Sequence, residues 1–379
     1  MPCTRCALDD PDDRIGGYRD RNHYHGAIPF GFYSQALSSR MQTSDSQYRI
    51  FAESAAGRTS AIVVPGWGAN VFSFAHHIPG QSTPIPIFEA VEMSRIAQRP
   101  GSYGMPLLAP FAGRVGRNQN GMFIYAGVQY RANPARHGFL RDSRWNVINA
   151  ANDSISCSLE VRPGSPAGES VFPFEFDANY SVSLSIQELK CVLTITSRAA
   201  YKQPLSVGWH PYLARNGRCE IHIPAGARWQ LDREAEPTPT GELLRVSGRD
   251  DFRRGRALSE QEHWDDIFSD LTASGQETHA WSDEYCANET HVTGRSRTHI
   301  RRRVSVPAVG NSRRGVISMP EMQLYTPIGR AAICLEPLSA PPNNVNLGTV
   351  LSHRADSIDL LPGETRQFEI RVTLELQEI

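Results

Sequence analysis

The stretch that decides the fold is Gln367-Phe-Glu-Ile-Arg-Val-Thr-Leu-Glu-Leu376, near the end of a chain of 379 residues. Apolar side chains occupy every second position from Phe368 to Leu376, and polar side chains fill the positions between them. A period of two places all the apolar side chains on one face of an extended strand, whereas helices repeat every ~3.6 residues. The stretch therefore predicts a β-strand with one buried face and one solvated face.

Similar signals recur from Gln47 onward, as alternating segments or as short apolar runs that Gly and Pro close. The predicted strands are residues 48–52, 61–64, 154–161, 180–186, 191–195 and 368–376. Helical periodicity is weak, and the best candidate for a helix is residues 87–98. Many short strands and few helices predict an all-β fold, a large antiparallel β-sandwich.

Two segments depart from this pattern. Residues 1–46 are rich in aspartate and arginine and show no sustained period, so they are predicted to be a poorly ordered N-terminal tail before a β domain at 47–379. Residues 276–314 contain seven arginines and few apolar residues, which predicts a long solvated loop inserted in that domain. An anion- or nucleic-acid-binding patch is the alternative, but no aromatic side chains interleave with the arginines.

The composition excludes several classes of protein. The 39 basic and 40 acidic residues give a net charge of −1, so we expect no nucleic-acid partner and no attraction to an anionic membrane. Only Lys190 and Lys202 are lysines, and neither follows the glycine pattern of a phosphate-binding loop. No apolar run is long enough for a transmembrane helix, and the first residues lack the apolar region of a signal peptide. Seven scattered cysteines are expected to be reduced thiols in a cytoplasmic protein.

Common cofactor and metal motifs are missing as well. The patterns Gly-x-Gly-x-x-Gly, Gly-x-Ser-x-Gly and His-Glu-x-x-His are absent, which removes the usual signs of a dinucleotide fold, an α/β-hydrolase and a zincin. Cys3 and Cys6 form one Cys-x-x-Cys pair, which supplies too few ligands for a zinc site. We therefore expect neither a cofactor nor a metal.

Two clusters place a polar side chain in a loop. Met105-Pro-Leu-Leu-Ala-Pro-Phe-Ala-Gly-Arg114 ends on an arginine, which could fork two hydrogen bonds onto a polyol or an anion. The alternative for Arg114 is a surface position at a strand end. Arg136-His-Gly-Phe-Leu140 places His137 before a glycine, which favours a turn, and a structural histidine is the alternative to a functional one.

Two further clusters supply an imidazole and a carboxylate. Leu205-Ser-Val-Gly-Trp-His-Pro-Tyr-Leu213 places His210 at the end of a predicted strand, where the following proline ends the pairing. Ala331-Ala-Ile-Cys-Leu-Glu-Pro-Leu338 places Glu336 at the end of an apolar strand, where a carboxylate must be paired or must have a raised pKa. A core histidine with a satisfied hydrogen bond and a strand-end salt bridge are the alternatives to a catalytic pair.

A carboxylate and an imidazole in one site could exchange protons with a sugar hemiacetal. One group takes the proton of the anomeric hydroxyl while the other gives a proton to the ring oxygen. The ring then opens, the aldehyde end turns, and the ring recloses on either face. Such a reaction needs no metal, nucleotide or covalent intermediate, in agreement with the missing motifs.

Several motifs follow one another in a specific order between about Tyr48 and Leu376, excepting residues 276–314. They are Pro-Leu-Leu-Ala-Pro-Phe-x-x-Arg, Gly127-Val-Gln-Tyr130, His-Gly-Phe, Phe172-Pro-Phe174 with Tyr180, Gly-Trp-His-Pro-Tyr, Trp264-Asp-Asp-Ile-Phe268, Leu324-Tyr-Thr-Pro327 and Leu-Glu-Pro. In this order the chain resembles the aldose 1-epimerase (galactose mutarotase) family. The resemblance implies that family's antiparallel β-supersandwich, and an isomerase of carbohydrate metabolism that binds its sugar in an open cleft on one sheet.

The resemblance also implies roles for individual residues. Glu336 looks like the catalytic base and His210 like the catalytic acid. The residues that look like sugar-binding positions are Arg114, His137 and Asp265. Asp265 is chosen over its neighbour because the family pattern is Asp-x-x-Phe.

The chain departs from the family pattern at two places. Gly113 stands where the family often has an asparagine, and the stretch between Asp265 and Leu324 is longer than expected. A further sugar ligand from that stretch therefore has no assigned position.

Two other functions stay open beside an aldose 1-epimerase acting on a neutral hexose. A hexose-6-phosphate 1-epimerase would need arginines converging on the sugar, and Arg117, Arg141 and Arg144 are available by count. A non-catalytic sugar-binding protein is the other alternative, although the presence of both His210 and Glu336 argues against it. In each case we expect a small sugar as ligand and a monomer or homodimer.

Overall fold

The computed structural model describes residues 46–55, 57–117, 120–164, 172–215, 219–234, 237–259, 261–271, 279–291, 294–305, 319–347 and 359–378. These residues belong to one compact unit, Ser44–Ile379. Apart from Ser46, the tail predicted for residues 1–46 lies outside the described residues.

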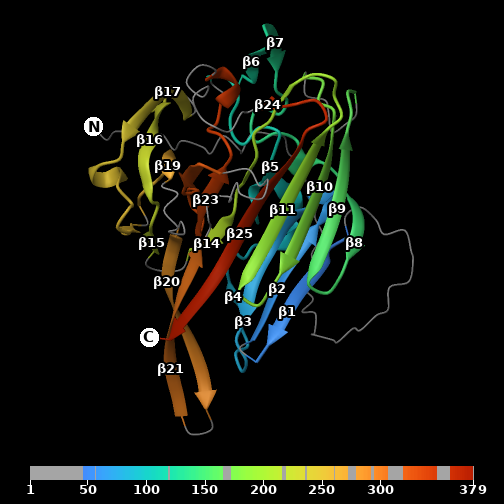
Figure 1. The fold of residues 1–379 in the computed structure, drawn as a ribbon. Helices are drawn as coiled ribbons and strands as arrows, with labels where there is room; N and C mark the ends of the chain where they lie inside the picture. The colour runs from blue at the N-terminus through green and yellow to red at the C-terminus, as the bar shows by residue number, and fades with distance from the viewer. Residues whose placement is uncertain are drawn as a thin grey trace, which may run out of the picture. The chain divides into compact units, whose positions relative to one another are not determined.

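Two large antiparallel sheets make up most of the described fold (Figure 1). The first has nine strands in the order β18 (Arg256–Leu258), β15 (Cys219–Ile221), β20 (His279–His291), β21 (Gly294–Ser305), β25 (Thr365–Glu378), β11 (Glu188–Ser197), β10 (Phe176–Leu184), β9 (Ser154–Val161) and β8 (Asn146–Ala150). The second has eight strands: seven in the order β17 (Thr238–Arg245), β16 (Ala225–Asp232), β19 (Asp265–Leu271), β22 (Glu321–Tyr325), β23 (Ala332–Leu338), β13 (Gly208–Trp209) and β5 (Leu107–Leu108), with β14 (Tyr212–Ala214) pairing on β23 beside them. The predicted all-β antiparallel fold is thus confirmed.

Smaller elements complete the unit. A four-stranded sheet contains β1 (Tyr48–Ser54), β2 (Gly57–Val64), β3 (Asn70–His77) and β4 (Ile85–Pro86). Two-stranded pairs join β6 (Met122–Tyr125) to β7 (Val128–Arg131) and β12 (Gln203–Pro204) to β24 (Asp359–Leu360). The helical elements are α1 (Met93–Gln98) and the 3-10 turns Pro65–Trp67, Pro100–Ser102, Leu140–Asp142, Gly248–Asp250 and Asn344–Asn346. No helix in the described ranges has the length and apolar character needed to cross a membrane.

The hydrophobic core contains side chains from both large sheets. In β25, Phe368, Ile370, Val372 and Leu374 are each at most 3% exposed, while the polar residues between them are intermediate or exposed. β25 pairs with β11 so that Phe368 lies opposite Leu193. The same core cluster includes Leu324 and Leu335 of the eight-stranded sheet. Burial of each such side chain contributes about 1.5–3 kcal/mol, which is why the alternation predicted this strand well.

The helix predicted over residues 87–98 is only half present. Only Met93–Gln98 is helical, and Ile87 and Phe88 instead donate their N–H groups to the carbonyl of Phe74. Phe88 also forms an isolated bridge with Leu213 of β14. Pairing with these strands overrides the weak local preference for a helix.

The loop predicted within residues 276–314 contains two long strands, β20 and β21, which pair as an antiparallel ribbon (Figure 1). The prediction of an unpaired loop is wrong for these strands, because a ladder of main-chain hydrogen bonds requires no apolar side chains. The register sets Glu284 opposite Arg301 and Asp283 opposite Arg302. The rest of this segment lies outside the described residues.

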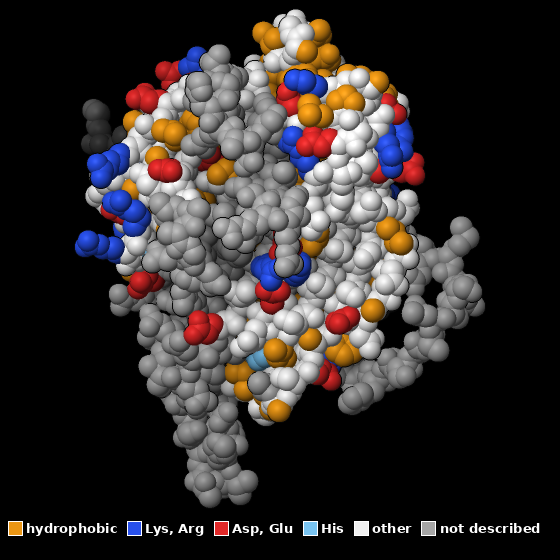
Figure 2. Space-filling view, viewed as in Figure 1, with side chains coloured by type: hydrophobic (Ala, Val, Ile, Leu, Met, Phe, Trp, Pro, Cys, Tyr) orange, Lys and Arg blue, Asp and Glu red, His pale blue; other side chains and the backbone are white. Residues whose placement is uncertain are grey.

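Charges of both signs are interspersed over the face shown in Figure 2. Hydrophobic side chains gather at the β6–β7 hairpin, where Ile124 and Val128 are exposed (Figure 2). The site residues predicted from the sequence lie elsewhere, on or beside the eight-stranded sheet.

Candidate active site

Strand alternation in the eight-stranded sheet separates the core from a second, polar face. In β23, Ile333 and Leu335 join the main core cluster, so Glu336 points to the opposite side. In β22, Leu324 likewise joins the core, so Gln323 points the other way. Gln323 lies opposite Glu336 in the β22–β23 register, which places the amide and the carboxyl side by side on the polar face.

The register of β13 and β14 brings His210 to Glu336. Gly208 of β13 pairs with Leu338, and Tyr212 of β14 pairs with Cys334, so the residue midway between the two strands falls opposite Glu336. That residue is His210, and its N–H bonds to the carbonyl of Pro106 rather than to β23. Because Pro211 has no N–H to donate, the ladder is interrupted at this point.

The carboxylate of the site is that of Glu336 on β23. It is fully buried, and neither carboxylate oxygen accepts a hydrogen bond from the residues that the structure describes. Burial raises the pKa of Glu336 well above its usual range, and the charge of Asp265 raises it further. Arg114 and Arg136 oppose this rise in part. A carboxylate with open lone pairs and increased proton affinity has the properties of a general base.

His210 lies against that carboxylate. Its Nε2 is 3.2 Å from Oε1 of Glu336. Burial lowers the pKa of the His210 imidazole well below its usual range, and the charges of Arg141, then Arg330 and Arg136, lower it further. The two groups are therefore both shifted toward their neutral forms. With one proton between them, the pair has two arrangements, a carboxylic acid with a neutral imidazole or a carboxylate with an imidazolium.

His137 places a second imidazole beside that of His210. Its ring meets that of His210 edge-on, with 5.6 Å between centroids. It occupies a turn, as predicted, with φ of +66° followed by Gly138 at +64°. A Cβ on Gly138 would lie 2.1 Å from the carbonyl oxygen of Ala109, so only glycine fits there. Burial lowers the pKa of His137, with the charge of Arg141 next in effect, and its Nδ1 has no partner among the described residues.

Arg114 and Asp265 form an ion pair beside the carboxylate, with 2.7 Å between Nη2 and Oδ2. Arg114 also donates to the carbonyl of Pro237, and Asp265 accepts at Oδ1 from Nε2 of Gln323 at 2.7 Å. Oε1 of Gln323 is buried and has no partner among the described residues. Two of the three predicted sugar-binding positions, Arg114 and Asp265, thus contact each other directly, and Gln323 extends this network from Asp265.

Gln323 was not among the residues predicted from the sequence. Its signal was present, since it lies two residues before Tyr325 on a short strand and so shares that side chain's face. The information that was missing is the register, which sets Gln323 opposite Glu336.

Packing against Pro342 explains why position 113 is a glycine. A Cβ there would lie 2.4 Å from Cγ of Pro342, so the proline ring fills the space of a side chain. The next residue, Asn343, has φ of +62°, donates its N–H to the carbonyl of Arg114 at 2.7 Å, and accepts from the N–H of Gly116 at 2.9 Å. The loop after β23 therefore packs on the segment that presents Arg114.

The arginines considered for a phosphate have separate surroundings. Arg117 is largely exposed and pairs with Asp232 and Glu234. Arg141 is largely buried and, of the three, is the one whose charge acts most on the two histidines.

Comparisons with known proteins agree with this architecture. A family model described as aldose 1-epimerase matches residues 53–373. No curated protein sequence matches the chain. Among solved structures, a putative aldose 1-epimerase from Escherichia coli K12 is similar, with a TM-score of 0.60 and 19% identity, covering 88% of this chain and 100% of that one. A GalM/aldose epimerase homologue from C. elegans has a TM-score of 0.63 and 17% identity, covering 87% and 99%. A galactose mutarotase-like protein from Clostridium acetobutylicum has a TM-score of 0.59 and 17% identity, covering 88% and 99%.

Proposed function

Because the chain belongs to the aldose 1-epimerase family, we propose that it is an isomerase that interconverts the α and β anomers of a hexose. The observation that carries the proposal is the Glu336 carboxylate, buried without a hydrogen bond from any described residue and 3.2 Å from Nε2 of His210. A structural carboxylate would be expected to have hydrogen-bond partners, because leaving a buried charge unpaired is costly. An acid–base pair needs those lone pairs open for the substrate.

In the proposed reaction Glu336 is the base and His210 is the acid. Glu336 takes the proton of the anomeric hydroxyl while the imidazolium of His210 donates its proton to the ring oxygen. The bond between the anomeric carbon and the ring oxygen breaks, and an open-chain aldehyde forms. Rotation of the aldehyde end, followed by the reverse proton transfers, recloses the ring with the opposite configuration.

The proton balance of this reaction follows from the pair itself. One proton is held before ring opening, on His210, and one is held after it, on Glu336. Burial disfavours charge on both groups, so it raises the energy of the ion-paired arrangement relative to the neutral one. Ring opening as proposed takes the pair from the charged arrangement to the neutral one.

The remaining polar groups would hold the sugar hydroxyls. Oε1 of Gln323 and Nδ1 of His137 have no partners among the described residues. Oε1 of Gln323 could accept a hydrogen bond from a hydroxyl, and Nδ1 of His137 could accept or donate one. Arg114 and Asp265 fix each other and would present a preorganised donor and acceptor. A neutral hexose fits this set, because Arg117 is already paired with two carboxylates.

Polarimetry tests the proposal directly. Purified protein is added to freshly dissolved α-D-glucose or α-D-galactose, and the approach to the equilibrium rotation is followed beside a protein-free sample. We expect acceleration by the unaltered chain and almost none by Glu336→Gln. Glu160→Gln is the matched control, since Glu160 is an exposed carboxylate on β9 whose loss should leave the rate unchanged.

A folded protein that accelerates neither sugar would contradict the proposal. Folding is checked by circular dichroism and thermal unfolding of each variant. Acceleration that persists in Glu336→Gln would instead show that another group is the base.

A further inference from the structure

His210 lacks the hydrogen bond that commonly fixes a catalytic imidazole. Its Nδ1 has no partner among the described residues, although a carbonyl or carboxylate usually occupies that position. The ring must therefore be held by packing. Tyr212 supplies it, with the two rings nearly parallel at 14° and 4.4 Å between centroids. Tyr325 meets the same imidazole edge-on at 5.8 Å.

The Tyr212 ring is itself covered by an arginine. The guanidinium of Arg330 lies 4.3 Å from the centroid of Tyr212 and 4.6 Å from that of Tyr103. The four side chains form a continuous contact series, Tyr103–Arg330–Tyr212–His210. A guanidinium over an aromatic face is attracted by the ring, most strongly where water is excluded.

Hydrogen bonds to Glu89 and Ser102 fix the guanidinium of Arg330. Its guanidinium donates to both carboxylate oxygens of Glu89 and to the carbonyl of Ser102 at 2.9 Å. Arg330 and Glu89 are largely buried, with side-chain exposures of 18% and 13%. The N–H of Glu89 in turn donates to the carbonyl of Tyr212 at 2.8 Å. Glu89 thus holds both the guanidinium and the backbone that carries the stacked tyrosine.

We propose that Arg330, clamped by Glu89, is a positioning residue of the reaction: it holds Tyr212 against the His210 imidazole and so fixes the ring plane that faces the sugar. Arg330 touches neither the sugar site nor Glu336 in any contact of the described structure, so it acts through Tyr212. The importance of this inference for catalysis rests on the proposed function, but the geometry of the clamp does not.

The charge of Arg330 also lowers the pKa of His210, so the titration of His210 gives a second measurement of the clamp. The titratable and charged groups around His210 are Glu336 on β23, Tyr212 on β14, Tyr325 on β22, His137, and the arginines Arg141, Arg330 and Arg136. Burial opposes the charge of Arg330, but the hydrogen bonds and the charge of Glu89, together with Tyr212 and Cys334, outweigh it and raise the pKa of Arg330. Loss of that cation should let His210 bind a proton more readily.

Three variants and one control separate the roles. Arg330→Met keeps an unbranched apolar side chain but removes the guanidinium group, with its hydrogen bonds and its charge. Arg330→Lys keeps the charge without the two-pronged grip on Glu89. Glu89→Gln keeps Arg330 but weakens the hydrogen bonds that hold its guanidinium.

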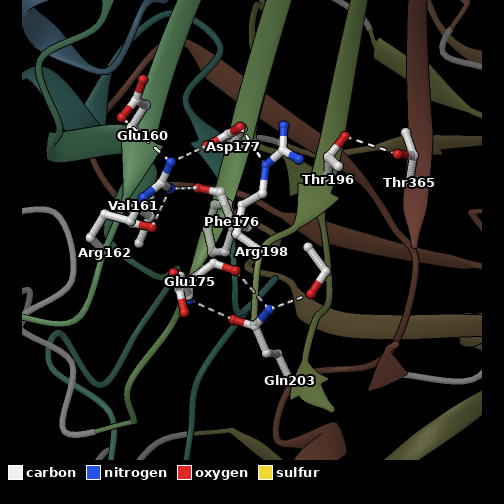
Figure 3. Close-up of polar contacts among 11 residues, drawn as sticks. Glu160, Val161, Arg162, Glu175, Phe176, Asp177, Thr196, Arg198, Gln203 and Thr365 are labelled. Carbon is white, nitrogen blue, oxygen red and sulfur yellow. Dashed lines mark hydrogen bonds and ion pairs between the residues drawn. The ribbon is translucent and has the colours of Figure 1, made fainter. Parts of the chain in front are cut away.

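Arg162→Met is the matched control, because Arg162 also holds a carboxylate and two main-chain carbonyls, but on the nine-stranded sheet (Figure 3). It binds Asp177 at 2.7 Å.

Two measurements are made on the full chain. Polarimetry gives kcat and KM, and NMR follows the ring signals of His210 in the sugar-free protein against pH, assigned by their absence in His210→Gln. For Arg330→Met we expect kcat to fall by about 10- to 100-fold, as for a misplacement of the order of 1 Å, with KM little changed. The His210 titration should move to higher pH. Arg330→Lys should keep the titration near that of the unaltered chain yet fail to restore kcat.

The possible results test the clamp separately from the proposed function. If Arg330→Met is folded and leaves both kcat and the His210 titration unchanged, or if Arg330→Lys restores kcat fully, the clamp is refuted. If Arg330→Met does not fold, Glu89→Gln and Arg330→Lys carry the same test. If the unaltered chain has no epimerase activity, the proposed function fails, and a titration that moves in Arg330→Met but not in Arg162→Met still supports the clamp.

Discussion

Replacing Glu336 by glutamine should make the protein inactive and more stable at once. The two side chains have nearly the same shape, so the substitution removes a charge and a proton acceptor with little change in packing. Loss of a general base costs about 10²- to 10⁴-fold in rate. At 1.36 kcal/mol for each tenfold, that is about 3–5 kcal/mol of lost transition-state stabilisation.

The gain in stability follows from the burial of the carboxylate. Its pKa is raised in the folded chain, which means that the ionised form is better solvated after unfolding than before it. Above the pKa of the unfolded chain, near 4.3, Glu336 therefore lowers the free energy of unfolding, and this penalty grows until the pH reaches the raised pKa of the folded state. Below that unfolded pKa both states are protonated and the penalty vanishes.

Glu336→Gln should accordingly unfold at a higher urea concentration than the unaltered chain at pH 7. We expect its free energy of unfolding to be higher by about 0.5–2 kcal/mol, the gain common for a single stabilising substitution. The difference should shrink as the pH is lowered toward 4. Urea unfolding followed by tryptophan fluorescence at several pH values measures it, and polarimetry measures the rate. A variant less stable than the parent at pH 7 would show that the carboxylate makes a stabilising contact, and the reasoning from an unpaired base would be refuted.

Other substitutions test the packing and the sugar contacts. Gly113→Ala should destabilise the chain by about 1–3 kcal/mol in urea unfolding, because its Cβ would meet the ring of Pro342 at 2.4 Å; an unchanged midpoint would contradict that contact. Asp265→Asn should weaken the hold on Arg114 and raise KM by roughly tenfold to a hundredfold, the equivalent of one lost charged hydrogen bond, with polarimetry at several sugar concentrations as the measurement. Gln323→Ala should raise KM more than it lowers kcat, and a pure loss of kcat would assign Gln323 to the chemical step instead.

The strands with one buried face were predictable from the sequence because burial imposes a period of two. β25 and β11 show this alternation, and their buried residues face one another in the core. Residues 87–89 misled the prediction because their main chain pairs with β3 and β14 rather than within a helix. β20 and β21 were missed because their pairing is a matter of main-chain hydrogen bonds, whereas the prediction relied on apolar side chains.

The candidate site was predictable from the sequence only at residues whose type and sequence neighbours indicate a chemical role. Glu336 after an apolar run and His210 before a proline are conspicuous in the sequence. Gln323 and Arg330 are ordinary surface residue types, and their importance depends on the register and on contacts with residues far along the chain. Gly113 stands where the family often has an asparagine, and the structure shows that the ring of Pro342 occupies the space of a side chain there.

The interruption between β13 and β14 explains how a sheet can hold an acid and a base side by side. In a continuous ladder His210 and Glu336 would face each other across the strands, with the carboxylate covered by the regular packing of its neighbours. Pro211 removes one donor from the ladder with β23, while the N–H of His210 continues the pairing on the β5 side by bonding to the carbonyl of Pro106. The pairs on either side of the gap, Gly208 with Leu338 and Tyr212 with Cys334, keep the register. The imidazole therefore stays at the height of the carboxylate, with its Nε2 3.2 Å from Oε1 of Glu336.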